Sequence, residues 1–247
     1  MIPLVDEGLG NSAYLVDLGD GRAPAIDPSR DLRSDGRTFP HRGLGEDDEV
    51  DLRGLTLRAL TTPGHTPEHL SYLLLDGTTP LGVFTGGSLL VGAAARTDLV
   101  GAEHTEELAR AQYRSLRRLA TLPDATAVFP TLGAGSFCSG SPGAERTSTI
   151  GAQRAANPYL AAADEDTFVR LLLSSLGTYP GYFDRLGEVN RRGPALIEPN
   201  PALAALSPTD VQVLRASGAE IIDVRSYEAY AQDWANAATG RTVQVDA

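Results

Sequence analysis

The sequence predicts an α/β protein of the α+β kind, in which helices cover a largely antiparallel sheet. Short apolar runs recur at close spacing between residues 11 and 130 and are separated by turn residues, which is typical of antiparallel strands. Helical spacing of apolar residues then appears after residue 104. With 247 residues, of which 42% are hydrophobic, the chain can bury a sizeable core.

The strands are expected in order. Residues 11–27 alternate apolar and polar positions around a Gly-Asp-Gly turn, which predicts a hairpin. The next stretch, 30–48, is charged and lacks apolar periodicity, so it is predicted to be a loop, and it contains His41. Further strands are expected at Val50–Leu60, Leu70–Leu75, Leu81–Phe84 and Thr126–Pro130.

The clearest helix is expected over residues 104–120. Its apolar residues share one face, its first turn is acidic and its last turn carries arginines, which suits the helix dipole. Thr105 is the expected N-cap. For His104 we expect a partly exposed position at the helix start rather than a catalytic role. Other helical patterns fall at 150–156, 164–176 and, more weakly, 180–190.

The chain is predicted to hold one domain at 1–190 and a shorter C-terminal segment at 207–247. The stretch between them, 191–206, bears prolines and reads as a linker. Within the second segment we expect a short amphipathic helix, Pro208–Ser217, and a buried strand, Glu220–Val224. The tail has too little apolar periodicity to complete a domain.

Composition excludes several classes of function. The net charge of −11 argues against nucleic acid or an anionic membrane surface as the main partner. All 21 basic residues are arginine, which excludes lysine Schiff-base chemistry. The single cysteine, Cys138, cannot form an internal disulfide. No leader-like or membrane-spanning run is evident, so we expect a soluble cytoplasmic protein.

The stretch 61–71, TTPGHTPEHLS, is the best candidate for chemistry. It places His65 and His69 in a Pro-Gly turn between two strands, and turns at strand ends commonly carry functional residues. The alternative is a surface hairpin with solvated histidines. Two histidines provide at most half of a metal site.

Several motifs together resemble the metallo-β-lactamase superfamily, in its persulfide dioxygenase and glyoxalase II-like branch, over roughly residues 1–190. The resemblance implies an αββα sandwich with a metal held by loops at one edge of its two sheets. Residues 206–230 resemble the opening of a rhodanese domain, but no cysteine follows Cys138, so we expect a fragment without sulfur transfer. The superfamily motifs lie at 11–16, 25–29, 63–69, 84–89, 96–99 and 130–136.

The metal ligands that the resemblance implies are mostly missing. His65 matches the histidine of the family's PGHT turn, but the HxHxDH segment is absent, so that one half of the sandwich is expected to be truncated. The acidic position is Gly87 and the histidine of the PTHG turn is Leu132. Because a metal needs about three protein ligands, we expect a degenerate site, no cofactor and no family activity.

If a metal site survives, it would hold Fe or Zn. Its candidate ligands are His65, His69 and Asp98, although the family uses the His69 position to support the turn. His41 and Cys138 are further possible donors.

Two other functions stay open, so whether the protein is an enzyme is undecided. One is an active metallohydrolase or persulfide dioxygenase with a rebuilt or metal-free site, in which His65 is the general base. Arg96 or the amides of residues 133–136 would then hold an oxyanion, and Cys138 is a candidate nucleophile. The other is a binding module for a small sulfur or thioester metabolite.

The missing segment also predicts a partner. Removing a strand and its helices exposes a sheet edge and an apolar face, which must be covered. A second copy of the chain, another protein or the C-terminal fragment would serve.

Overall fold

A computed structural model describes residues 1–6, 11–27, 43–133, 136, 145–179, 181–185 and 205–219. The chain divides into two compact units, Met1–Leu196 and Ile197–Ala247. His41, Cys138 and the predicted strand Glu220–Val224 lie outside the described residues. The predicted linker and rhodanese-like segment lie largely outside them as well and stay predictions.

The first unit is built on a six-stranded sheet with the order β11-β10-β7-β6-β5-β4. β10 and β7 run parallel and the other pairs are antiparallel, which confirms the predicted sheet type. Its strands are β4 (Glu49–Asp51), β5 (Thr56–Thr61), β6 (Leu70–Asp76), β7 (Thr79–Gly86), β10 (Ala127–Pro130) and β11 (Ser148–Thr149).

A smaller sheet has the order β1-β2-β3, and its second and third strands confirm the hairpin predicted at 11–27. The first strand of this sheet was not predicted. These strands are β1 (Ile2–Asp6), β2 (Asn11–Leu15) and β3 (Ala25–Ile26), and a separate two-stranded ribbon pairs β8 (Leu89–Leu90) with β9 (Ala93–Ala94).

The single strand predicted at Val50–Leu60 is wrong, because this stretch folds back as the hairpin of β4 and β5. Val50 pairs with Leu57, and the N–H of Leu52 donates to the carbonyl of Leu55 at 2.8 Å. Arg53 (φ 61°) and Gly54 (φ 127°) occupy the left-handed region that makes so tight a reversal possible.

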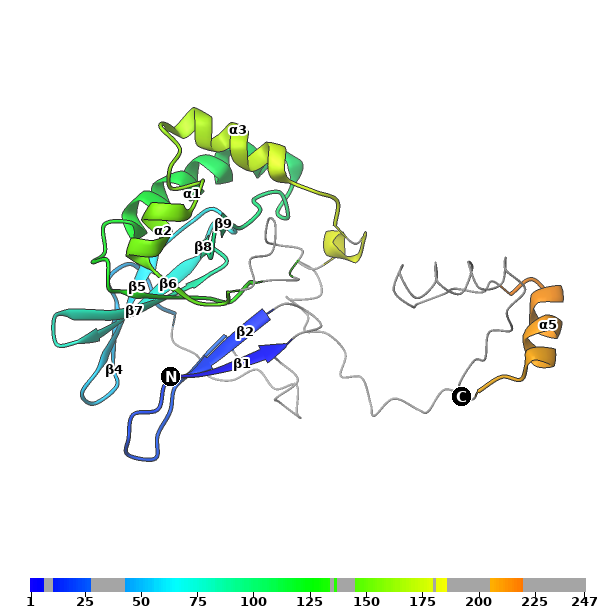
Figure 1. Ribbon diagram of the computed structural model, residues 1–247, viewed down its shortest axis with the longest axis horizontal. Coiled ribbons are helices and arrows are strands. Elements are labelled where there is room, and N and C mark those ends of the chain that lie inside the picture. Colours follow the sequence, from blue (N-terminus) through cyan, green and yellow to red (C-terminus); the bar gives the residue numbers. More distant parts are fainter. Residues whose placement is uncertain are drawn as a thin grey trace. The chain divides into compact units, whose positions relative to one another are not determined.

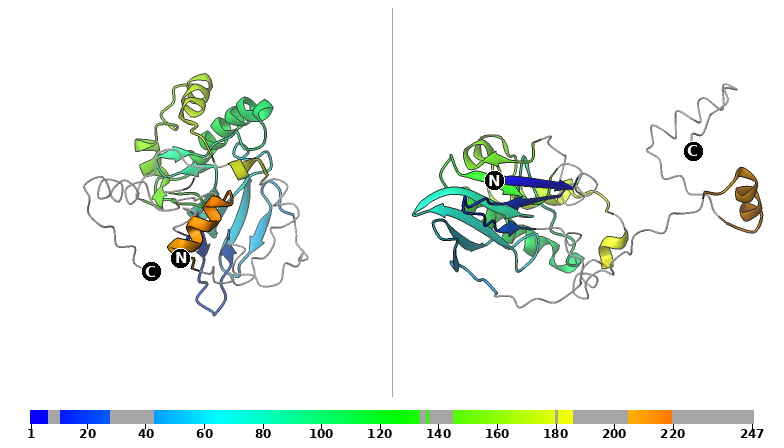
Figure 2. Two further views of the ribbon diagram at one scale, coloured as in Figure 1. Left: turned by 90° about the vertical axis from the view of Figure 1, so that its right-hand side faces the viewer. Right: turned by 90° about the horizontal axis from the view of Figure 1, so that it is seen from below.

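The layers form the predicted sandwich. Helices cover one face of the six-stranded sheet, and the small sheet packs on the opposite face (Figures 1 and 2). One apolar cluster, which includes Leu73, Leu116 and Phe168, lies between helices and sheet. A second cluster lies between the two sheets and includes Tyr14, Leu74 and Phe84. Adjacent leucines of β6 therefore point into different cores, as strand alternation requires.

The helices of the first unit bury one stripe each. The longest begins at Thr105, and its N-cap is His104, not the predicted Thr105. The Thr105 hydroxyl donates instead to the carbonyl of Gly101 at 3.2 Å, and His104 is exposed, as expected. The helices are α1 (Thr105–Leu119), α2 (Ile150–Ala156) and α3 (Glu165–Ser175), and one 3₁₀ turn, η2 (Ala102–His104), precedes α1. Another 3₁₀ turn, η3 (Gly181–Arg185), lies within the stretch predicted to be helical at 180–190, and the rest of that stretch lies outside the described residues.

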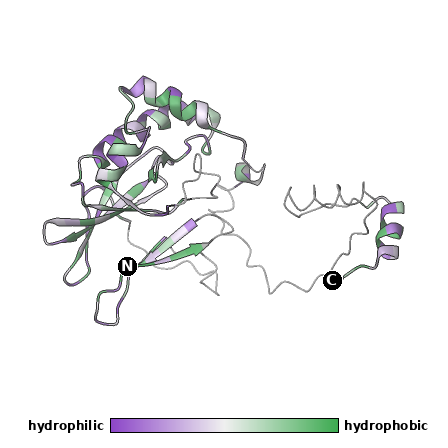
Figure 3. Cartoon of the chain, viewed as in Figure 1, coloured by the Kyte–Doolittle hydropathy of each residue, from purple (hydrophilic) through white to green (hydrophobic). Residues whose placement is uncertain are grey.

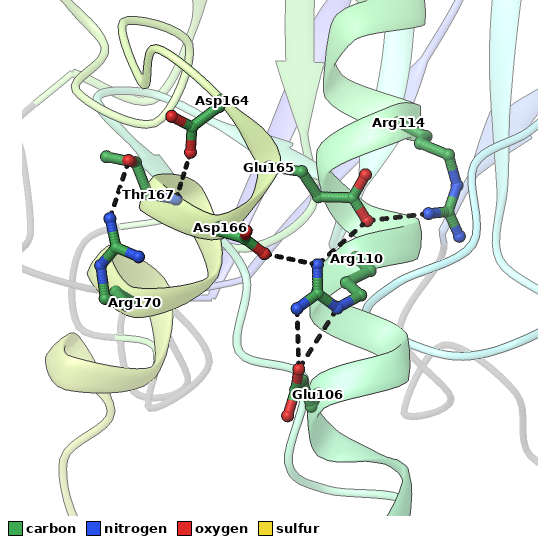
Figure 4. Close-up of polar contacts among 8 residues, drawn as sticks. All are labelled: Glu106, Arg110, Arg114, Asp164, Glu165, Asp166, Thr167 and Arg170. Carbon is green, nitrogen blue, oxygen red and sulfur yellow. Dashed lines mark hydrogen bonds and ion pairs between the residues drawn. The ribbon is translucent and has the colours of Figure 1, made fainter.

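α3 packs along α1. The rings of Tyr113 and Phe168 meet with centroids 5.5 Å apart. Outside this apolar contact, Arg110 binds Glu106 and Asp166, and Glu165 bonds to Arg114 at 3.0 Å (Figure 4). Because these ion pairs are largely solvent-exposed, the apolar contact holds the two helices together more than the charges do.

The outer face of the small sheet is apolar. The register places Ile2 opposite Leu15 and Leu4 opposite Ala13, on the side away from buried Tyr14. Ile2 is 51% exposed and Leu4 is 38% exposed, and β1 is coloured as hydrophobic in Figure 3. The missing segment and the partner that would cover this face stay predictions.

In the second unit the structure describes residues 205–219, which contain α5 (Pro208–Ala216), close to the predicted helix. Ser207 and Asp210 form a capping box at its start. Within the described residues of the chain, no helix is both long enough and apolar enough to cross a membrane.

Candidate functional site

Several strand ends meet at one edge of the two sheets. The N–H of Thr131, which follows β10, donates to the carbonyl of Gly86 at the end of β7 at 3.0 Å. The carbonyl of Thr131 in turn accepts the N–H of Ser12 in β2 at 2.7 Å. The turn that carries His65 and His69 begins after β5 and ends before β6, at the same edge. The chain therefore gathers the predicted motifs where the resemblance places the site.

Helix α1 packs directly against this turn. Gly64 has φ +152°, and a Cβ there would lie 1.9 Å from Oε1 of the fully buried Gln112. Gln112 also donates from Nε2 to the carbonyl of Ser88 at 2.7 Å, and the Ser115 hydroxyl donates to the carbonyl of Pro63 at 2.7 Å. The turn needs glycine at position 64 because its backbone lies directly on the helix.

His65 is held in one tautomer. Its Nδ1 lies 2.9 Å from the backbone carbonyl oxygen of Arg96. A carbonyl only accepts, so Nδ1 carries the proton and Nε2 presents a lone pair. Burial lowers the pKa of the imidazole, and the Arg96 carbonyl only partly opposes this. His65 is therefore neutral near pH 7 and offers one basic nitrogen.

His69 has partners on both ring nitrogens. Its Nε2 accepts the backbone N–H of Gly87 at 3.1 Å, so Nδ1 must carry the proton and donate to Oγ1 of Thr62 at 2.8 Å. The Thr62 hydroxyl then bonds to the Ser71 hydroxyl at 2.8 Å. Burial lowers the pKa of His69 to about 4. The side chain supports the turn and has no free lone pair.

Gly87 and Gly86 allow the β7 end to approach both imidazoles. A Cβ at position 87 would lie 2.4 Å from Cδ2 and 3.0 Å from Nε2 of His65. A Cβ at position 86, where φ is +53°, would lie 2.6 Å from Nε2 of His69. The family's acidic side chain at position 87 therefore does not fit beside His65 as the ring now lies.

Arg96 and Asp98 bind each other. Nε and Nη2 of the guanidinium donate to the two carboxylate oxygens at 2.7 and 2.8 Å. The hydrogen bond from Arg96 lowers the pKa of Asp98. Nη2 also donates to the carbonyl of Gly177 at 2.9 Å, and the guanidinium lies 4.6 Å from the ring centroid of Tyr179. Arg96 is only 5% exposed, so its charge is directed at groups of this protein.

These contacts do not fit the metal that the resemblance implies. Within the described ranges, no three His, Cys, Asp or Glu side chains form a group able to hold a metal ion. Of the three candidate ligands, His65 offers one lone pair, His69 has used its own, and both oxygens of Asp98 bind Arg96. Leu132, at the PTHG position, bridges to Asn11 at this edge and offers no donor.

The structure thus brings four predicted residues together: His65, His69, Arg96 and Asp98. The remaining candidate, Cys138, is not among the described residues. Sequence reasoning missed the polar side chains that hold the turn, Thr62, Ser71, Gln112 and Ser115. Only their burial and partners reveal them, because isolated serines, threonines and glutamines carry no motif.

No family model matches the chain. It is 38% identical over 101 residues to the human hydroxyacylglutathione hydrolase-like protein, which covers 40% of this chain and 32% of that protein. The chain spans 30% to 44% of the length of the curated relatives it matches.

Two solved structures have a similar fold. A metallo-beta-lactamase from Staphylococcus aureus subsp. aureus COL matches with a TM-score of 0.76 and 26% identity, over 94% of this chain and 81% of that one. ETHE1 from Myxococcus xanthus matches with a TM-score of 0.62 and 26% identity, over 78% of this chain and 99% of that one. The fold is therefore that of the metallo-β-lactamases.

The relatives agree with this fold. The chain is similar to the metallo-β-lactamase superfamily in fold and in sequence, with hydroxyacylglutathione hydrolases and ETHE1 among its neighbours.

Proposed function

We propose that this protein is a non-catalytic member of the superfamily whose site edge is retained without the family's metal-dependent activity. The observation that carries the proposal is the position of Gly87, which donates its N–H to His69 and packs against His65. Where the family has an acidic side chain, this chain has backbone in contact with both imidazoles.

The cost of rebuilding the site supports the proposal. Freeing Nε2 of His69 would leave the N–H of Gly87 without this partner, which costs about 1–3 kcal/mol for a buried group. Freeing Asp98 would leave the buried guanidinium of Arg96 without this carboxylate; the cost is about 3–5 kcal/mol for a fully buried pair and smaller here, because the Asp98 side chain is 20% exposed. One ligand, His65, would then still have to be complemented by donors from elsewhere.

Metal analysis of the purified full chain tests the proposal. After dialysis, we expect Fe and Zn far below one atom per chain. One tightly bound atom per chain would overturn the proposal if it is lost in His65→Ala. A metal retained equally in His65→Ala would be bound elsewhere. Metal analysis of Cys138→Ser and His41→Ala would then test whether either of these residues binds it.

A second candidate function is metal-free catalysis by His65. It is favoured by the fixed tautomer, which directs a neutral, basic Nε2 away from the Arg96 carbonyl. The name hydroxyacylglutathione hydrolase suggests glutathione thioesters as substrates to try, and the sequence resemblance to persulfide dioxygenases suggests glutathione persulfide. Turnover that falls at least about 100-fold in His65→Ala, but not in the exposed His104→Ala, would establish this function over the first.

The same site edge could retain a sulfur or thioester metabolite without converting it. A thermal-shift screen with these compounds separates this form of the proposal from a purely structural protein, because a ligand that binds only the folded state stabilises it by RT ln(1 + [L]/Kd) and so raises the melting temperature. A shift that disappears in His65→Ala would place the compound at this edge.

A further inference from the structure

We infer that Arg96 is a positioning residue for His65: its side chain is anchored so that its own backbone carbonyl fixes the proton of His65 on Nδ1. The inference holds whether or not the site is catalytic. It also gives Arg96 a different role from the oxyanion binding predicted from the sequence.

The first anchor is Asp98. Two parallel hydrogen bonds, of 2.7 and 2.8 Å, join the guanidinium to the carboxylate two residues further along the chain. A bidentate pair of this kind fixes the plane of the guanidinium as well as its distance. Because the pair spans only one intervening residue, Thr97, it also restricts the backbone between Arg96 and Asp98.

The second anchor is the segment that follows α3. Nη2 of Arg96 donates to the carbonyl of Gly177 at 2.9 Å, and the guanidinium lies over the ring of Tyr179. The Tyr179 ring in turn stacks on Phe183 of η3, with centroids 5.7 Å apart. These contacts tie the loop after β9 to residues more than eighty positions later in the chain, at a side chain that is 5% exposed.

The backbone of Arg96 carries the effect to His65. Its carbonyl oxygen accepts the Nδ1 proton at 2.9 Å, and this contact decides which ring nitrogen is basic. If the side chain lost its anchors, the peptide plane could rotate and the carbonyl would leave Nδ1. The imidazole would then exchange between its two neutral tautomers.

The test is an NMR measurement on the full chain labelled with ¹⁵N-histidine, at about pH 8, where neutral imidazoles predominate. Long-range ¹H–¹⁵N spectra distinguish protonated from unprotonated ring nitrogens, and His65→Gln assigns the signal. In the unaltered chain we expect His65 to be in the Nδ1–H tautomer. An Nε2–H tautomer, or a mixture, would overturn the inference before any further variant is made.

Two variants then each remove one anchor of Arg96, and a third variant, Tyr179→Phe, is the control for a general loss of stability. Tyr179→Ala and Asp98→Asn should move the His65 nitrogens toward the average of both tautomers, with a loss of at least half of their separation. Tyr179→Phe keeps the ring over Arg96 and should retain the original signal. His69, held by Thr62 and Gly87, should be unchanged and serves as the internal control. A His65 signal unchanged in folded Tyr179→Ala would also overturn the inference.

Discussion

Nε2 of His69 accepts the backbone N–H of Gly87 at 3.1 Å, and this single bond joins the histidine-bearing turn to the end of β7. The bond requires a neutral imidazole, because a protonated Nε2 would be a donor facing another donor. The contact that removes His69 from the set of possible ligands therefore also makes the turn sensitive to acid.

Acid should destabilise the protein between about pH 6.5 and pH 4. The pKa of His69 falls from 6.5 to about 4 on folding, chiefly through burial. Since the folded-state pKa is the lower one, the stabilisation is complete above pH 6.5 and is lost as the pH falls through 4. The loss amounts to roughly 3 kcal/mol, measurable as a lower urea midpoint.

The control for the acid effect is His69→Gln. This variant should be less stable at pH 7 but should show a smaller decrease between pH 7 and pH 4.5, since the His69 imidazole is gone while His65, whose pKa burial also lowers, remains. Glu46 does not interfere in this range. Its hydrogen bond with Arg118 lowers its pKa from 4.5 to about 2, so its contribution is lost only below pH 4.5. An equal decrease in both proteins would contradict the assignment to His69.

Gly87→Ala should displace the His65 ring. The new Cβ would lie 2.4 Å from Cδ2, which no rotation of a methyl group can relieve. We expect a loss of about 1–3 kcal/mol in the free energy of unfolding and a changed His65 signal in ¹⁵N spectra. Gly45→Ala is the control, because its Cβ would be 3.8 Å from the nearest atom and should change stability by no more than ~0.5 kcal/mol.

Gly64→Ala should be more damaging than Gly87→Ala. Its Cβ would lie 2.7 Å from the backbone Cα of Gln112, so α1 itself would have to move, and φ is +152°. We expect a loss of about 3 kcal/mol or more, or failure to fold. Gly92→Ala shares the left-handed backbone, with φ +68°, but has open space around it and should cost only about 1 kcal/mol. Similar losses in the two variants would contradict the close approach of turn and helix.

Tyr14→Phe tests how the small sheet is fastened to the large one. The buried Tyr14 hydroxyl donates to the carbonyl of Pro130 at 2.7 Å, while its ring packs on Phe84 and Phe129. Removing the hydroxyl keeps the ring contacts but leaves the carbonyl without this donor, so we expect a loss of about 1–3 kcal/mol in chemical denaturation. Tyr72→Phe, at a half-buried ring, should cost less.

The elements of the fold followed largely from local sequence. The hairpin at 11–27, the strand at Leu70–Leu75 and the helices α1, α2 and α3 all lie close to their expected positions. Their signals are short-range, because apolar periodicity and capping residues act within a few positions. The prediction of one strand at Val50–Leu60 was wrong because Arg53 adopts a left-handed backbone conformation, which an arginine does not predict.

The sequence by itself determined the resemblance to the metallo-β-lactamase superfamily, the turn that carries His65, and the residue types at positions 87 and 132. Only the tertiary structure decided what these residues do. The tautomer of His65 depends on a carbonyl 31 positions away, and the guanidinium of Arg96 binds a carbonyl 81 positions away. Such contacts depend on how the layers pack. Periodicity and motif spacing therefore placed Arg96 near the site, and the fold directed its charge into the protein interior.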